Sequence, residues 1–167
     1  TPNHQSYLDA FVLTAAVPPD FAYVAKSELE GNAIARIFLR RLGTVFVERF
    51  EPAQGSEEMR KVLEAVRGGD SLVLFPEGTF RRAPGLLPLR MGAFLVAADA
   101  GVPVVPVVIR GTRSKLRGDD FLPRRGGAEV EVLPPIRPEG EGWSAAVKLR
   151  DRVHAEILGR CGEPDAG

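Results

Sequence analysis

His4 and Asp9, near the start of the chain, form the first pair whose residue types and spacing could do chemistry. On an unbroken α-helix, side chains at this separation lie about 140° apart around the axis and about 7.5 Å apart along it. The two side chains can therefore meet only if His4 lies in the turn before a helix and Asp9 lies in its first turn. Ser6 as N-cap and Asp9 three residues later match a capping signature ahead of the apolar run AFVL, which predicts that turn.

The pair of His4 and Asp9 admits two interpretations. In the first, Asp9 only satisfies amide groups at the start of the helix, and His4 is an incidental loop residue. In the second, the carboxylate fixes the tautomer of the imidazole and stabilises the ring once it has taken a proton, so that His4 is a general base. No G-x-S-x-G turn presents a serine, Ser6 is better explained as a cap, and Cys161 has no base beside it in sequence. These observations favour a hydroxyl of the substrate as the attacking group.

A second candidate stretch is LVLFPEGTFRR, residues 72–82. A buried strand is expected to end at Pro76, which places the following loop where α/β proteins usually hold their ligands. Gly78 allows a ligand to approach the backbone closely, and Thr79 offers a hydroxyl. Glu77 precedes them, and Arg81 and Arg82 follow. The stretch is not a phosphate-binding P-loop, and it could equally be only a tight turn.

A third stretch, GTVFVERF, ends an expected strand with Glu48 and Arg49. An arginine at the end of a strand can bind a phosphate through its planar guanidinium group. Charged residues at strand ends are also commonly just solvated, and Arg49 could form a purely structural ion pair with Glu48 or Glu77. Taken singly, none of the three stretches decides the function.

The elements that must position these residues alternate between helices and strands, which indicates an α/β fold with a single-layer, mixed and mostly parallel sheet flanked by helices. The two prolines in VPVVPVVI place that strand at a sheet edge or at a bulge. The expected helices are 6–16, 29–43, 56–69, 90–101 and 143–158, and the expected strands are 21–26, 44–48, 71–75, 102–109 and 128–133.

Composition limits the class of protein. The 167 residues suit one domain, which we expect to span residues 1–160 and to be followed by a polar tail at 161–167. A single cysteine excludes a disulfide framework or a zinc cluster and is natural in a reducing compartment. Residues 81–125 carry nine basic and three acidic side chains, a net charge of +6 that could attract an acidic or phosphorylated partner. No apolar run reaches the length of about 20 residues that spans a bilayer, and the chain looks like a domain of something longer.

Together, the stretches NHQSYLD, GTVFVER, FPEGTF and VPVVPV resemble, in order and spacing, the four sequence blocks of the glycerolipid acyltransferases. The resemblance runs from residue 3 to about residue 109. It implies transfer of a fatty acyl group from acyl-CoA or acyl carrier protein to a hydroxyl of a lysophospholipid or glycerol phosphate, without a metal or other cofactor. By the same resemblance, His4 is the base, Asp9 orients it, and the acceptor is held by Arg49, Glu77, Gly78, Thr79 and Arg81.

The chain departs from the family pattern at three places. Phe80 follows Thr79 where arginine is usual, which weakens any phosphate role for Arg81, and Glu48 stands where aspartate is common. The membrane-holding helices that precede the first block in full-length members are not part of this sequence. We nevertheless expect a peripheral position on the cytoplasmic face of a membrane, with the basic and apolar stretch 34–42 as one candidate contact. No nucleic-acid partner is expected.

Two competing hypotheses remain at this point. One is a thioesterase or lipase that uses the same His4 and Asp9 pair to activate water. The other is a non-catalytic lipid-binding domain within a fusion protein, which the presence of His4 disfavours.

Overall fold

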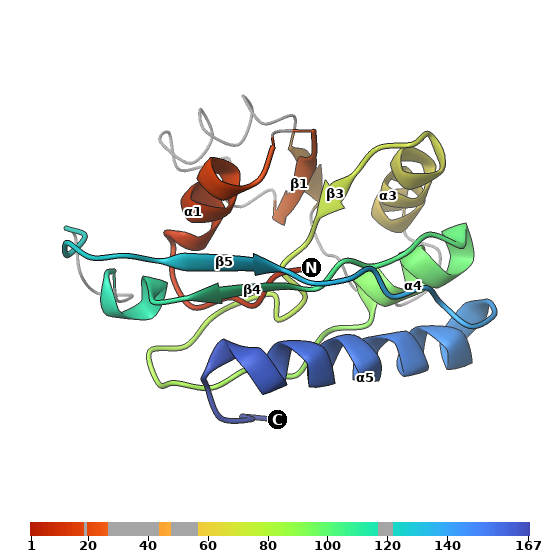
Figure 1. Ribbon diagram of the computed structural model, residues 1–167. Helices are drawn as coiled ribbons and strands as arrows, with labels where there is room; N and C mark the ends of the chain where they lie inside the picture. The colour runs from red at the N-terminus through yellow and green to blue at the C-terminus, as the bar shows by residue number, and fades with distance from the viewer. Residues whose placement is uncertain (19, 27–43, 48–56, 117–121) are drawn as a thin grey trace.

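The computed structural model describes residues 1–18, 20–26, 44–47, 57–116 and 122–167 (Figure 1). The expected helix at 29–43, the lipid-facing stretch 34–42, Glu48 and Arg49 lie outside these ranges. The helices are α1 (Asp9–Ala16), α3 (Glu57–Arg67), α4 (Gly92–Ala100) and α5 (Gly142–Cys161), with a short 3-10 helix, η2 (Thr112–Ser114). The strands are β1 (Ala22–Lys26), β2 (Val45–Val47), β3 (Leu72–Val73), β4 (Val107–Arg110) and β5 (Glu129–Val132).

The strands give the mixed, mostly parallel arrangement that the sequence predicts. Strands β2, β1 and β3 form a parallel sheet in that order, while β4 and β5 pair antiparallel. Pro2 adds a parallel bridge to Val107, so the segment before His4 runs along the other side of β4. In the part of the chain that the structure describes, the strands therefore form two small sheets instead of one continuous layer.

Prolines and a tight turn explain why two strands are shorter than expected. Strand β3 ends at Val73, and the chain turns soon afterwards, where the Gly78 N–H donates to the Phe75 carbonyl at 3.0 Å. Regular pairing in β4 begins only after Pro106, although Val104 makes an isolated bridge to Ile136. Since proline has no N–H to donate, the ladder cannot run unbroken through 102–106.

The helices cover both faces of the β4–β5 pair, with α1 on one side and α5 on the other (Figure 1). Helix α5 buries Leu149, Val153 and Ile157, which are four residues apart and share one face. These side chains pack with Phe94 of α4 and Val108 of β4 in the largest core cluster. Val108 and Ile109 are neighbours in β4 and are both fully buried, but they belong to different core clusters. Ile109 packs against Leu13 of α1 in the second cluster.

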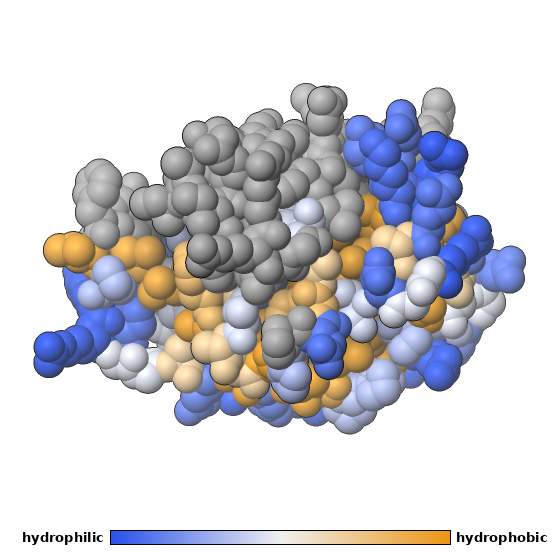
Figure 2. All heavy atoms as spheres, turned by 90° about the horizontal axis from the view of Figure 1, so that it is seen from above, coloured by the Kyte–Doolittle hydropathy of each residue, from blue (hydrophilic) through white to orange (hydrophobic). Residues whose placement is uncertain are grey.

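Helix α3 covers the edge of the parallel sheet with a narrow apolar stripe. Val62 is fully buried against Val96 of α4, while the exposed face carries the i,i+4 pairs Lys61–Glu57 and Arg60–Glu64. Figure 2 shows this charged face as a hydrophilic region over α3 beside apolar residues. Such exposed pairs contribute little to stability, so the helix depends on its buried stripe.

Candidate active site

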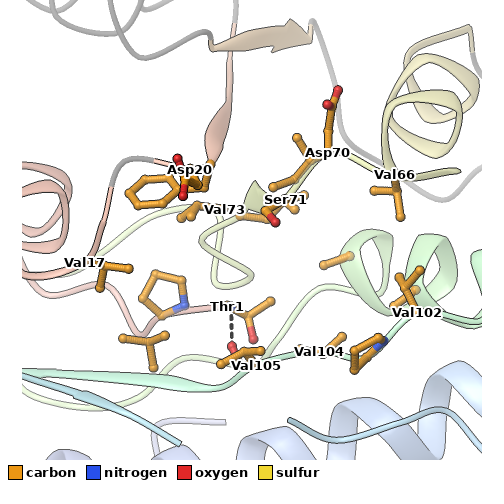
Figure 3. A pocket seen from close by; sticks show the side chains of 18 of the residues that line it. Thr1, Val17, Asp20, Val66, Asp70, Ser71, Val73, Val102, Val104 and Val105 are labelled. Carbon is orange, nitrogen blue, oxygen red and sulfur yellow. Dashed lines mark hydrogen bonds between the residues drawn. The ribbon is translucent and has the colours of Figure 1, made fainter. Parts of the chain in front are cut away.

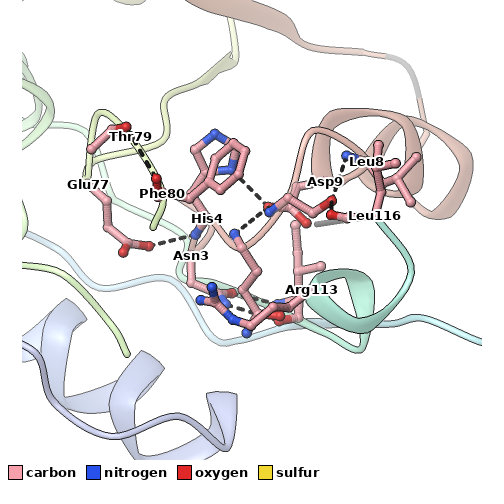
Figure 4. A network of polar contacts seen from close by, with 12 residues as sticks. Asn3, His4, Leu8, Asp9, Glu77, Thr79, Phe80, Arg113 and Leu116 are labelled. Atoms are coloured by element: carbon pink, nitrogen blue, oxygen red, sulfur yellow. Dashed lines mark hydrogen bonds and ion pairs between the residues drawn. The ribbon is translucent and has the colours of Figure 1, made fainter. Parts of the chain in front are cut away.

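The His4 and Asp9 side chains are in direct contact. His4 Nδ1 lies 2.8 Å from Asp9 Oδ2, and Asp9 is completely buried (Figure 4). The same oxygen accepts hydrogen bonds from the Gln5 N–H at 2.6 Å and the Ser6 N–H at 2.8 Å. Asp9 Oδ1 is buried and has no hydrogen-bond partner among the described residues. One carboxylate therefore both closes the turn and holds the imidazole, so the two interpretations of the sequence are compatible.

The turn forms slightly differently from the predicted cap. Helix α1 begins at Asp9, not near Ser6, because Ser6 to Asp9 first make a tight turn, in which the Asp9 N–H donates to the Ser6 carbonyl at 3.1 Å. Ser6 Oγ accepts from the Leu8 N–H at 3.2 Å and donates to the Leu116 carbonyl at 2.8 Å. Ser6 thus ties the start of α1 to the loop after η2.

The contact with Asp9 determines which ring nitrogen of His4 can act on a substrate. A carboxylate can only accept, so Nδ1 carries the proton in the neutral ring and Nε2 has the free lone pair. The His4 side chain is 20% exposed, which leaves the ring accessible. This is the arrangement that a general base requires.

Aromatic side chains hold the His4 ring. The ring centroid lies 4.4 Å from that of Phe75, which follows β3, and 4.7 Å from that of Phe80. Phe80 also makes an edge contact with Tyr7 at 4.8 Å. Phe80, the departure from the family pattern, is thus part of the wall around His4, a role that the sequence analysis missed.

Asn3 anchors the backbone just before His4. Its buried side chain donates to the Ile109 carbonyl at 3.0 Å and accepts from the Ile109 N–H at 2.7 Å, as a neighbouring strand would. The Asn3 N–H also donates to the Val107 carbonyl at 3.3 Å. The only sequence signal for this role is an amide residue next to the histidine, which by itself indicates nothing about a partner so far along the chain.

Glu77 joins the predicted loop to the first stretch. Its Oε1 accepts from the His4 N–H at 2.6 Å and its Oε2 accepts from the Leu87 N–H at 2.8 Å (Figure 4). The residue is 3% exposed, and this burial raises the pKa of Glu77 to about 7, although the two amide hydrogen bonds lower it. Since both oxygens are engaged by backbone amides, the geometry favours a role in holding His4 over direct contact with an acceptor.

The other predicted loop residues lie beside this anchor. Gly78 has a φ of +69°, a backbone conformation that favours glycine, and the Arg90 side chain lies next to its Cα. Thr79 and Arg81 are exposed on the same loop, and the Arg81 carbonyl accepts a hydrogen bond from Arg113. The structure thus joins His4, Asp9 and Glu77 in one network and places Gly78, Thr79 and Arg81 on the loop that follows Glu77. Arg49 lies outside the described ranges.

An apolar cavity of about 600 Å³ lies away from this cluster (Figure 3). It opens between the amino ends of β1 and β3, helix α4 and the segment before β4, whereas His4 packs against Phe75 beyond the other end of β3. Its wall includes Val17, Ser71, Val73, Val102 and Val104. The cluster around His4 and Asp9 and the cavity are therefore separate features.

The described residues contain neither a metal-binding cluster nor a membrane-spanning helix. Within the described ranges, no three His, Cys, Asp or Glu side chains are grouped as a metal site would need. None of the helices in those ranges is both long enough and apolar enough to cross a membrane.

Several known proteins resemble this chain in sequence over most of its length. The chain is 31% identical over 157 residues to 1-acyl-sn-glycerol-3-phosphate acyltransferase alpha of Ovis aries, covering 93% of this chain and 55% of that protein. It is 34% identical over 158 residues to 1-acyl-sn-glycerol-3-phosphate acyltransferase of Saccharomyces cerevisiae, covering 90% of this chain and 52% of that protein. The chain thus spans about half the length of these relatives.

A solved structure shares the fold. The crystal structure of the 1-acyl-sn-glycerophosphate (LPA) acyltransferase PlsC from Thermotoga maritima matches with a TM-score of 0.77 and 27% identity, covering 93% of this chain and 61% of that one. The family model described as Acyltransferase matches residues 1–110, which include His4, Asp9 and the loop around Glu77. The chain therefore belongs to the acyltransferase family.

Proposed function

We propose that this chain is the catalytic part of an O-acyltransferase that moves a fatty acyl group from acyl-CoA or acyl carrier protein to a free hydroxyl of a lysophospholipid such as 1-acylglycerol-3-phosphate. The observation that carries the proposal is the 2.8 Å contact between His4 Nδ1 and the buried Asp9 carboxylate. The reaction named for the relatives from Ovis aries and Saccharomyces cerevisiae supports the choice of acceptor.

His4 acts as the general base in this proposal. Nε2 takes the proton of the acceptor hydroxyl while the hydroxyl oxygen attacks the carbonyl carbon of the thioester. The new C–O bond forms and the C–S bond breaks. The sulfur leaves as a thiolate, which takes the proton from the imidazolium and restores the neutral ring of His4. Asp9 keeps Nδ1 protonated and stabilises the positive ring during the step. Because a thioester is already activated, positioning and a base suffice without a covalent enzyme intermediate.

The loop after β3 is the proposed place for the head group of the acceptor. Gly78 lets the loop turn at a positive φ, Thr79 carries an exposed hydroxyl, and the exposed Arg81 can pair with a phosphate. Arg49, which the family resemblance makes the best candidate for the acceptor phosphate, stays a prediction from the sequence. Since acceptor and product are lipids, we also propose a peripheral position on the cytoplasmic face of a membrane.

Product analysis with the full-length protein tests the proposal. The protein is incubated with vesicles containing 1-acylglycerol-3-phosphate and with either acyl-CoA or acyl carrier protein as donor, and lipids are measured by mass spectrometry. We expect the diacyl product to form only when acceptor and one of the donors are both present.

Two other outcomes would contradict the proposal. Free fatty acid released equally with and without acceptor would identify a hydrolase that uses the same pair. Binding to lysophospholipid vesicles without any turnover of either donor would identify a lipid-binding domain.

A further inference from the structure

The last residues of the chain run beside the loop that follows Gly78. The Leu86 N–H donates to the Pro164 carbonyl at 2.9 Å, and the Ala166 N–H donates to the Leu86 carbonyl at 3.0 Å. Gly85 has a φ of +145°, and a Cβ there would lie 2.6 Å from Ala166 Cβ. Tail and loop are therefore in contact at a position where only glycine fits.

A shielded ion pair fastens this contact. Arg113 Nε lies 2.6 Å from Glu163 Oε1 and Arg113 Nη2 lies 2.6 Å from Glu163 Oε2, which is the two-pronged geometry that arginine and a carboxylate prefer. The two side chains are only 15% and 11% exposed. Glu163 Oε2 also accepts from the Gly85 N–H at 2.6 Å, and Arg113 Nη1 donates to the Arg81 carbonyl. The pair thus binds the backbone of the loop at two points.

This loop, residues 78–85, is also the segment whose Phe80 contacts His4. At its start, Glu77 is bonded to the amides of His4 and Leu87. At its end, the tail and Glu163 bind residues 85–86. Between these anchors lies Phe80, whose ring centroid is 4.7 Å from that of His4. Figure 4 shows Arg113 in the same view as His4, Glu77 and Phe80. Arg113 and Glu163 are 50 positions apart in sequence, so the contact joins the segment after β4 to the end of the chain.

We propose that Arg113 and Glu163 are positioning residues, which hold the 78–85 loop in the place where it receives the acceptor next to His4. This inference rests on the proposed acyltransferase function. Neither residue touches the reacting atoms in this account. They act through the Arg81 carbonyl and the Gly85 amide. By holding these two backbone groups, they set the positions of Phe80 and Arg81 relative to the imidazole of His4.

A purely structural pair and a positioning pair differ in what their loss does to the two substrates. Loss of a purely structural pair lowers the melting temperature and leaves the Michaelis constants of the folded enzyme unchanged. Loss of a positioning pair also misplaces the loop, and a displacement of about 1 Å can reduce a rate by up to about 100-fold. Because the loop is the proposed acceptor site, the change should appear in the KM for the acceptor and not in the KM for the donor.

The experiment compares Glu163→Gln and Arg113→Lys in the full-length protein, assayed well below their melting temperatures with acceptor and donor varied separately. Glu163→Gln removes the charge and keeps the size, and Arg113→Lys keeps the charge and removes the two-pronged geometry. We expect the KM for the lysophospholipid acceptor to rise about 10-fold in each, with the KM for the donor within about twofold of wild type. Arg152→Met is the control, because it breaks the exposed pair between Arg152 of α5 and Glu139, which precedes the helix, and should change neither constant.

Three results decide the inference. An unchanged acceptor KM in folded Glu163→Gln or Arg113→Lys would overturn it while leaving the proposed function intact. A wild-type protein that transfers no acyl group would instead overturn the proposed function. If Glu163→Gln does not fold, Arg113→Lys and Glu163→Asp supply the same comparison, and an acceptor KM equal to that of wild type in both would overturn the positioning role.

Discussion

The two ends of the parallel sheet differ in chemistry. Beyond the carboxyl end of β3, Phe75 and Glu77 belong to a dense network in which His4, Asp9 and nearby backbone amides are mutually bonded. At the amino ends of β1 and β3, an apolar cavity opens between Ser71, Val102 and their neighbours (Figure 3). Side chains at the first end are fixed by directional bonds, whereas the apolar side chains that line the cavity are held by packing. The difference predicts that substitutions at the first end act on catalysis and those at the second act weakly on stability.

The largest effect is expected for Asp9→Asn. An amide would present a donor to His4 Nδ1 and would favour the tautomer that has its proton on Nε2, the nitrogen that must accept one. We expect kcat to fall by about 1,000-fold or more, by analogy with the loss of the orienting carboxylate in other His-dependent enzymes. Steady-state kinetics measures the effect, and the circular dichroism spectrum checks that the fold is kept. A loss of less than tenfold would show that Asp9 only closes the turn.

Asn3→Ala is expected to have the next largest effect, this time on stability. The substitution leaves the N–H and carbonyl of the fully buried Ile109 without the side chain that pairs with both. Each unpaired buried group costs about 1–3 kcal/mol, so the free energy of unfolding should fall by about 3 kcal/mol. Denaturant unfolding measures this value. A change below about 1 kcal/mol would mean that water replaces the amide and that Asn3 does not anchor His4.

Glu77→Gln is expected to change how stability depends on pH. Burial raises the pKa of Glu77 to about 7 from an ordinary value of 4.5, so the folded protein binds this proton more tightly than the unfolded chain does. The resulting stabilisation is fully present below about pH 4.5 and is lost as the pH rises to about 7. Glutamine does not titrate, so the wild-type free energy of unfolding relative to the variant should fall by up to about 3 kcal/mol across this range. Urea unfolding at several pH values measures it, and a constant difference would show that the pKa of Glu77 is the same in the folded and unfolded chains.

The smallest effect is expected at the cavity. Val102 lines the existing opening, whereas Val108 is fully buried between helices and sheet. Val108→Ala should lower the free energy of unfolding by about 2 kcal/mol, and Val102→Ala should lower it by less than about 1 kcal/mol, because fewer contacts are lost there. Both variants should keep wild-type kcat. Equal costs at the two positions would show that the cavity is filled in the protein in solution.

The sequence predicted the parts of the site that depend on local geometry. The capping signature at Ser6 and Asp9 correctly indicated a turn, and this turn is what lets His4 and Asp9 meet at a separation that a straight helix forbids. The alternation of apolar segments predicted the α/β class and a mostly parallel sheet, and in the structure β1 pairs parallel with β2 and β3. The turn and the apolar alternation each depend on residues that are close together in the sequence, so capping rules and periodicity can predict them.

The sequence did not predict the long-range contacts. Glu77 meets the His4 amide from 73 positions away, and Asn3 pairs with Ile109 from 106 positions away. Glu163 belongs to a segment that composition describes only as a polar tail, and Cys161 before it is buried at the end of α5. Single charged or amide residues carry no periodic signal, and their partners are fixed only once the strands and helices have packed.

The central claim is that His4 is the base, and the chain contains a matched control for testing it. His154, the only other histidine, lies on α5 with a long 3.7 Å contact to Asp165. The most direct measurement is the rate of diacyl product formation by full-length wild type, His4→Ala and His154→Ala at saturating acceptor and donor. We predict that His4→Ala loses about 100- to 10,000-fold in rate with its fold intact, while His154→Ala retains the wild-type rate. A folded His4→Ala protein that turned over within a few-fold of wild type would contradict the account.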